Sequence, residues 1–193
     1  MGFCREGNGF PQIKSKTEIK YINCMENGYN NTALIKSENN FIKPIDEFNQ
    51  TFTFYYYESK LIFEKNEEIN IGFGNGNYII YLSPNNKLIF YNYQNKSNYI
   101  NLPLFVYKNE DIIGCGLVYP PKKLNNKLPY IFFTKNGKQI GKAILLENDF
   151  ESIRPFVWLK CCSIETNFGD YSFLYNVSKH YVINEFYKKE EFK

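Results

Sequence analysis

Asp111-Ile112-Ile113-Gly114-Cys115-Gly116-Leu117 and Ile131-Phe132-Phe133-Thr134-Lys135-Asn136-Gly137 are the two stretches that decide the fold. The second is an apolar, β-prone run that ends in Asn-Gly, a dipeptide that closes tight hairpins. The first is a similar run broken by a Gly-x-Gly, where missing side chains permit close packing or a bulge. Two such strands in order predict antiparallel β structure.

Short strands of the same kind are predicted along most of the chain. They are expected at 51–57, 69–74, 78–82, 87–91, 112–119, 130–134, 140–146, 156–167 and 172–177. Turn residues separate them and no amphipathic helix lies between them, a pattern typical of a β-sandwich or barrel. We expect an irregular segment at 1–19, an all-β domain at 20–177 and a polar tail at 178–193. The spacing of Val182, Phe186 and Tyr187 leaves two options for the tail, a short helix or a frayed end.

Length and composition fit one β domain. The 193 residues are 44% hydrophobic and include 17 Tyr and 18 Phe, side chains that favour pleated, half-buried surfaces. The net charge of +3 comes from 23 basic and 20 acidic residues without a strongly basic run, which argues against nucleic-acid binding. No window approaches the length of a membrane-spanning helix, so we expect no membrane association, and we expect a monomer.

The chain offers little raw material for catalysis or metal binding. Its five cysteines are odd in number and form no CxxC pair, which argues against zinc and favours small buried residues in a reducing compartment. His180 is the only histidine, so Cys-His or Ser-His chemistry is not expected. Trp158 is either a binding anchor or, the reading we favour, a core residue. We predict no enzyme, no metal and no cofactor.

Five segments in order resemble the SPRY domain family. With the family's pattern given in parentheses, they are 71–74 (I-G-x-G), 111–116 (D-V-I-G-C-G), 131–137 (I-F-F-T-K-N-G), 154–159 (Y-P-x-V-G-L) and 164–169 (V-x-x-N-F-G). The nearest likeness is to the Ran-binding-protein-M-like branch, which includes secreted SPRY effectors of plant-parasitic nematodes. The resemblance implies a bent sandwich of two antiparallel sheets whose rim loops bind short peptide segments of partner proteins. It implies no catalysis.

By the same resemblance, three segments form the binding rim: Lys43-Pro44-Ile45, the turn Gly74-Asn75-Gly76-Asn77, and Lys160-Cys161-Cys162-Ser163. Loops at the edge of a rigid scaffold can vary without unfolding it. The candidate partner-binding residues are Lys43, Pro44, Ile45, Asn75, Asn77, Lys160, Cys161 and Cys162. A purely structural role is the equal alternative at each position: Pro44 ends a strand, the Asn-Gly turn reverses the chain, and the cysteines are core.

The sequence therefore predicts a non-catalytic module that binds a short segment of a partner protein. A lectin-like β-sandwich is the alternative, because Asn, Tyr and Trp side chains could line a carbohydrate groove. We expect the protein in the cytoplasm, or, as an effector, secreted and delivered into the cytoplasm of a host cell.

Overall fold

The computed structural model describes residues 7–44, 51–76, 78–94, 96–121, 128–146, 150–180 and 183–193. Within these ranges the fold is nearly all β, as predicted. The strands are β1 (Phe10–Ile13), β2 (Glu18–Ile22), β3 (Ala33–Lys36), β4 (Phe41–Ile42), β5 (Thr53–Asn75), β6 (Tyr78–Ser83), β7 (Leu88–Tyr93), β8 (Lys96–Asn101), β9 (Ile112–Tyr119), β10 (Tyr130–Lys135), β11 (Lys138–Leu145) and β12 (Ser152–Asn167). No helix in the described ranges is long and apolar enough to cross a membrane.

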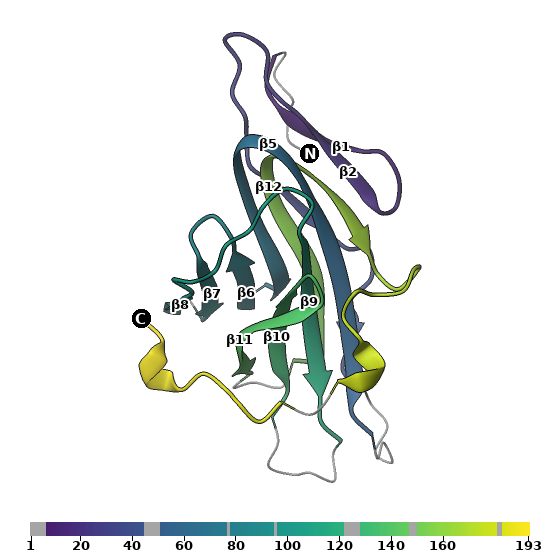
Figure 1. Ribbon diagram of the computed structural model, residues 1–193, viewed down its shortest axis with the longest axis vertical. Helices are drawn as coiled ribbons and strands as arrows, with labels where there is room; N and C mark the ends of the chain where they lie inside the picture. Colours follow the sequence, from purple (N-terminus) through teal and green to yellow (C-terminus); the bar gives the residue numbers. More distant parts are fainter. Residues whose placement is uncertain are drawn as a thin grey trace.

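Two long strands, β5 and β12, run through both layers of the sandwich. In the first layer the order is β11-β10-β9, the first half of β5, the second half of β12, then β2 and β1. In the second layer it is β8-β7-β6, the second half of β5 and the first half of β12, which β3 and β4 flank. All these pairings are antiparallel, and Figure 1 shows β5 and β12 curving over one end of the molecule. The bent antiparallel sandwich is confirmed.

The bend coincides with a break in the β5–β12 ladder. Lys160 pairs with Glu68, and the next pair is Cys162 with Phe63, so the ladder skips residues 64–67 of β5 and, on β12, Cys161, which bulges. Its φ of 56° lies in the left-handed region, which is uncommon for a residue with a Cβ. We call this the bend end. The open end lies opposite, where β5 finishes at Asn75 and β12 begins.

The core lies between the two layers. Successive side chains of a strand point to opposite faces, and those that point inward build the core. Among them are the fully buried Leu61, Ile71 and Phe73. The hydroxyl of Tyr57, in the first layer, donates to the carbonyl of Gly72 in the second at 2.8 Å. Burial of each large apolar side chain contributes roughly 1.5–3 kcal/mol, so this shared interior is the main force that holds the layers together.

The stretches 111–117 and 131–137 lie side by side in the antiparallel pair of β9 and β10. Asp111, just before β9, is buried, and its carboxylate accepts hydrogen bonds from the Asn136 amide at 2.7 Å and the Lys108 backbone at 2.8 Å. It also pairs with Lys135 at 3.1 Å. Burial alone would raise the pKa of Asp111, but these partners hold it below its usual value. Asn136 and Gly137 have φ values of 48° and 74°, which confirms the tight Asn-Gly turn.

The Gly-x-Gly of β9 makes room for aromatic side chains. A Cβ on Gly114 would come within 2.0 Å of the Tyr56 hydroxyl, and one on Gly116 within 2.1 Å of the Phe132 ring. Tyr56 and Phe132 lie across Gly116 on neighbouring strands and stack at 6.2 Å. The glycines therefore serve packing, as the sequence indicated.

The C-terminal segment covers the outer face of the first layer. Glu58 is only 5% exposed, and its carboxylate accepts the backbone N–H groups of Leu174 and Tyr175, both at 2.9 Å. His180 lies against the Phe132 ring at 5.0 Å and is hydrogen-bonded to two tyrosine hydroxyls. Residues 172–177 are not a strand, contrary to prediction: these side-chain contacts replace a ladder.

The same segment then reaches the free edges of both layers. It forms a bridge between Phe186 and Ala143 on β11, and Lys193 exchanges two backbone hydrogen bonds of 3.0 Å with Tyr99 on β8. Val177–Lys179 and Lys189–Glu191 are single 3-10 turns, so the tail is neither the short helix nor the frayed end considered from sequence. The predicted irregular segment at 1–19 also differs, because it contains β1 and the start of β2.

Candidate functional site

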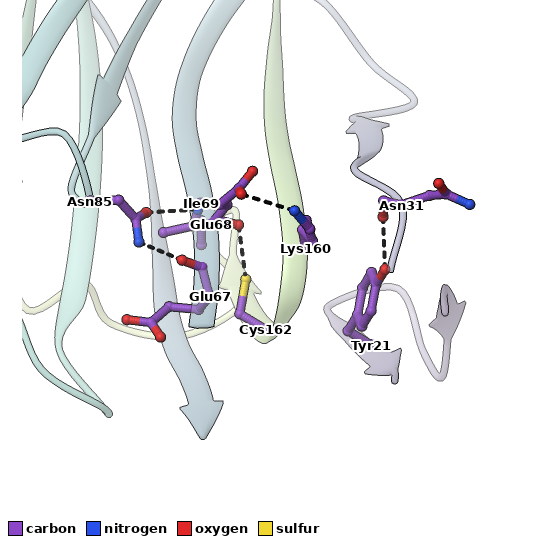
Figure 2. Close-up of polar contacts among 8 residues, drawn as sticks. All are labelled: Tyr21, Asn31, Glu67, Glu68, Ile69, Asn85, Lys160 and Cys162. Carbon is purple, nitrogen blue, oxygen red and sulfur yellow. Dashed lines mark hydrogen bonds and ion pairs between the residues drawn. The ribbon is translucent and has the colours of Figure 1, made fainter. Parts of the chain in front are cut away.

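Lys160, Cys161 and Cys162 lie at the bend end, inside β12, and not in a loop. The Lys160 ammonium pairs with Glu68 at 3.0 Å, and the Cys162 thiol donates to the Glu68 carbonyl at 3.4 Å (Figure 2). Beside them, the Asn85 amide bonds the backbone of Glu67 at 2.5 Å and of Ile69 at 3.0 Å. These contacts satisfy the polar groups that the bulge leaves unpaired, and they give the segment a clear structural role.

The thiols at the bend are not activated. Cys162 is buried, and burial raises its pKa to about 12. Burial also raises the pKa of Cys161, more than Lys160 lowers it. Tyr21 lies close by with its hydroxyl donating to the Asn31 carbonyl at 2.7 Å, and burial raises its pKa to about 12 (Figure 2). A nucleophilic thiol needs a lowered pKa, so this cluster favours structure over chemistry.

Lys43, Pro44 and Asn75 meet at the open end. The Lys43 backbone N–H donates to the Glu151 carbonyl at 2.8 Å, directly after β4 pairs with the start of β12. The Asn75 side chain donates to the neighbouring Ser152 carbonyl at 3.0 Å. Of the predicted site residues, Ile45 and Asn77 lie outside the described residues.

The structure thus separates the three predicted segments. Ser152, next to Lys43 and Asn75, is nine positions from Cys161 along β12, a distance of about 30 Å at roughly 3.3 Å per residue. The expected single rim is wrong for this reason: β12 continues unbroken where a third rim loop was expected. Two of the three segments share a surface, and the third lies at the opposite end.

A hollow of about 260 Å³ opens beside Asn75. Its floor is Gly74, whose missing side chain leaves space on the outer face of the second layer. A Cβ built there would lie 3.2 Å from the Tyr78 carbonyl and 3.5 Å from both Ile79 and Phe156, so one methyl group nearly fits and anything larger would occupy the hollow. The described residues that line it are Leu34, Lys36, Gly74, Asn75, Gly76, Tyr78, Ile79, Asn92, Gln94, Arg154 and Phe156. We call this the Gly74 groove.

The groove has the character of a binding surface. Its lining combines two cations and three side-chain amides with apolar groups, and among the described residues it contains no Asp, Glu, His, Cys or Ser. Arg154 is fixed by a 2.7 Å hydrogen bond from its Nε to the Asn40 side chain. His180 lies on the outer face of the other layer, where burial lowers its pKa. The groove can therefore donate hydrogen bonds to a ligand from its cations and amides.

An aromatic patch continues from the groove along the same face. Arg154, Phe156 and Trp158 are alternate residues of β12, and Trp158 is partly exposed, not the core residue that we favoured from sequence. Tyr81 of β6 lies 5.5 Å from Trp158 and stacks on Phe90 at 4.9 Å. Phe156 is only 4% exposed and packs beneath Tyr81 and Trp158. We call Tyr81, Phe90, Phe156 and Trp158 the aromatic patch.

Sequence reasoning missed Arg154 and Gly74 as site residues, although both stood in the motifs considered. Arg154 stood only in the 154–159 segment, and Gly74 stood in the turn of the predicted rim without being a candidate binding residue. The signal was present in the alternation of β12, since residues 154, 156 and 158 of one strand face the same side. Which side faces solvent could not be read from the pattern.

Comparison with solved structures identifies the fold. A human SPRY domain matches with a TM-score of 0.53 and 16% identity, covering 84% of this chain and 97% of its own. The carbohydrate-binding module CBM66 from Bacillus subtilis matches with a TM-score of 0.46 and 8% identity, covering 83% and 89%. No protein-family model and no curated protein matches the sequence. The chain therefore has the fold of a SPRY domain, as the resemblance implied, while the Ran-binding-protein-M-like branch stays a prediction.

Proposed function

We propose that this chain is a non-catalytic interaction module that binds a short peptide segment of a partner protein in the Gly74 groove. The observation that carries the proposal is the meeting at the open end of Lys43, Pro44 and Asn75, predicted from the resemblance, with a hollow whose floor is a glycine. The cellular setting, its own cytoplasm or that of a host cell, stays a prediction from sequence.

The geometry of the groove suits an extended peptide. Asn75, Asn92 and Gln94 supply amide groups that can bond a peptide backbone, and Leu34 and Ile79 supply apolar contact. The scaffold beneath is a sheet whose register is set by the core, so the groove is preformed and binding orders few of its own groups. A preformed concave surface with a few directed polar groups is typical of a ligand site.

Selection from a displayed random-peptide library tests the proposal, with affinities of the selected peptides measured by fluorescence polarisation. Gly74→Ala and Gly74→Val fill the hollow in two steps. We expect affinity to fall with the volume added, and Gly74→Val to weaken binding at least about tenfold. The valine should be tolerated in the fold, because Gly74 lies in a strand and β-branched side chains suit strands.

Lys160→Gln is the control, since it removes the exposed ion pair at the bend end and leaves the Gly74 groove intact. Loss of binding in Gly74→Val with retention in Lys160→Gln supports the proposal. The reverse pattern would place the site at the bend end and contradict it. Binding of the chain to a glycan array, with no specific peptide selected, would favour the lectin-like alternative instead.

A further inference from the structure

We propose that the peptide bound in the Gly74 groove is acidic: an extended segment that sets a carboxylate against Lys36 and Arg154 and an aromatic or large apolar side chain against the aromatic patch. This inference rests on the proposed function and names the chemistry of its ligand. The argument combines the charge of the groove with the arrangement of side chains along one face of the second layer.

The groove carries two positive charges and no negative one among its described residues. Lys36 and Arg154 both line it, and neither forms an ion pair with a carboxylate in the part of the chain that the structure describes. Lysines elsewhere in the described residues, such as Lys135 and Lys160, do pair with carboxylates. An unneutralised pair of cations beside a hollow attracts an anion, and an arginine fork suits a carboxylate in particular.

Arg154 is held in place for such a contact. The bond from its Nε to the Asn40 side chain restricts the guanidinium and leaves its two terminal nitrogens for a ligand. Lys36 pairs across the β3–β12 ladder with Phe156, the residue two positions from Arg154, so its stem lies on the same face. Fixing a charged donor before binding reduces the entropy lost when the complex forms.

The apolar half of the proposed ligand is defined by Trp158. It lies on β12 four residues from Arg154, which places the two side chains about 13 Å apart at roughly 3.3 Å per residue. Leu34 pairs with Trp158 across the β3–β12 ladder and is 44% exposed, which extends the apolar surface. Phe156, between the two ends, contacts Trp158 at 5.4 Å and Tyr81 at 6.2 Å.

These dimensions predict the spacing in the ligand. A peptide in extended conformation spans about 13 Å with four residues, so an acidic residue and an aromatic residue about four positions apart would fill both parts of the surface. Apolar contact supplies most of the binding energy, and the charges choose the partner and its direction along the groove.

The library selection described above tests this inference when Lys36→Gln and Arg154→Gln are added. Lys36 makes no side-chain hydrogen bond within the described residues, so its replacement tests charge without disturbing the fold. Lys138→Gln, an exposed lysine on β11 in the other layer, removes the same charge elsewhere. We expect selected peptides enriched in Asp or Glu with an aromatic residue about four positions away. We expect about tenfold weaker binding for each groove variant, little change for Lys138→Gln, and weaker binding as salt rises to about 0.5 M.

The two proposals fail in different ways. Peptides that lose affinity in Gly74→Val but contain no acidic residue, and that bind Lys36→Gln as tightly as the parent, would overturn the acidic ligand and leave the groove as the binding site. Peptides that bind Gly74→Val as tightly as the parent, or a library without a specific binder, would overturn the proposed function itself. If Lys36→Gln and Lys138→Gln weaken peptide binding equally, the effect comes from the net charge of the protein and not from the groove, which would overturn the inference.

Discussion

Replacement of Glu58 by glutamine should loosen the C-terminal segment from the first layer. The Glu58 carboxylate is 5% exposed and accepts three hydrogen bonds: one oxygen from the Tyr56 hydroxyl at 3.0 Å and the Tyr175 N–H at 2.9 Å, the other from the Leu174 N–H at 2.9 Å. Burial raises the pKa of Tyr56, so this hydroxyl keeps its proton and acts as a donor. All three partners therefore require an acceptor at position 58.

Glutamine can keep only part of this arrangement. If its carbonyl oxygen replaces the oxygen that binds Tyr56 and Tyr175, its NH₂ group faces the Leu174 N–H, so that bond is lost and two donors oppose each other. A hydrogen bond to a charged group contributes about 1.5–3 kcal/mol, and the remaining two also weaken when the charge is removed. We expect Glu58→Gln to lower the free energy of unfolding by about 3 kcal/mol. For a chain of this size that lowers Tm by roughly 6–12 °C.

Urea unfolding and amide hydrogen exchange would measure the effect. We expect exchange at the Leu174 and Tyr175 amides to speed up more than exchange in the β strands, because these two N–H groups lose their acceptor. Glu110→Gln is the matched control: Glu110 is 70% exposed and pairs with Lys60 at 3.4 Å, a surface pair worth at most about 1 kcal/mol. A loss in Glu58→Gln no larger than in the control would refute the reasoning.

Two further predictions concern buried titratable groups. Burial lowers the pKa of His180, so the folded chain binds a proton at this ring less readily than the unfolded chain; stability should be level above about pH 6.5 and fall as pH drops below it. Urea midpoints between about pH 5 and pH 8 would show this, and His180→Phe should flatten the profile; identical profiles in both proteins would contradict it. Cys115 and Cys162 are buried with raised pKa values, so iodoacetamide at about pH 8 should modify them only after unfolding, as peptide mass spectrometry can follow. Rapid labelling of either thiol in the native protein would contradict this protection by burial.

Local signals in the sequence were sufficient for the antiparallel β class, and the bent sandwich came from the family resemblance. The Asn136-Gly137 turn was readable because only a few residues accept positive φ, and both do so here. Most of the strands between 51 and 167 were readable from alternating apolar residues. The strand β8 was not, because Lys96–Asn101 is mostly polar and lies at the edge of its layer. An edge strand buries little, so its composition resembles that of a loop.

The site was less predictable because it depends on contacts between distant segments. Asn75 could be placed at a turn from the local sequence, but its neighbours Arg154 and Lys36 come from strands that the sequence does not show to be adjacent. The prediction that Lys160–Cys162 lies in a rim loop was wrong for another reason. A bulge at Cys161 needs a left-handed residue, and neither Gly nor Asn marks it, so the strand could not be told from a loop.

The bulge at Cys161 also decides which side of β12 faces the interior. Even-numbered residues before it, such as Phe156 and Trp158, lie on the outer face, whereas even-numbered Cys162 and Ile164 after it belong to the core. One unpaired residue is an odd insertion, and an odd insertion reverses the alternation of a strand. Loss of a single residue at this point would therefore turn one half of β12 inside out: either Ile164 would leave the core, or Arg154, Phe156 and Trp158 would turn toward it. The orientation of Arg154, seven positions or about 23 Å from Cys161 along β12, is thus fixed by one residue at the bend end.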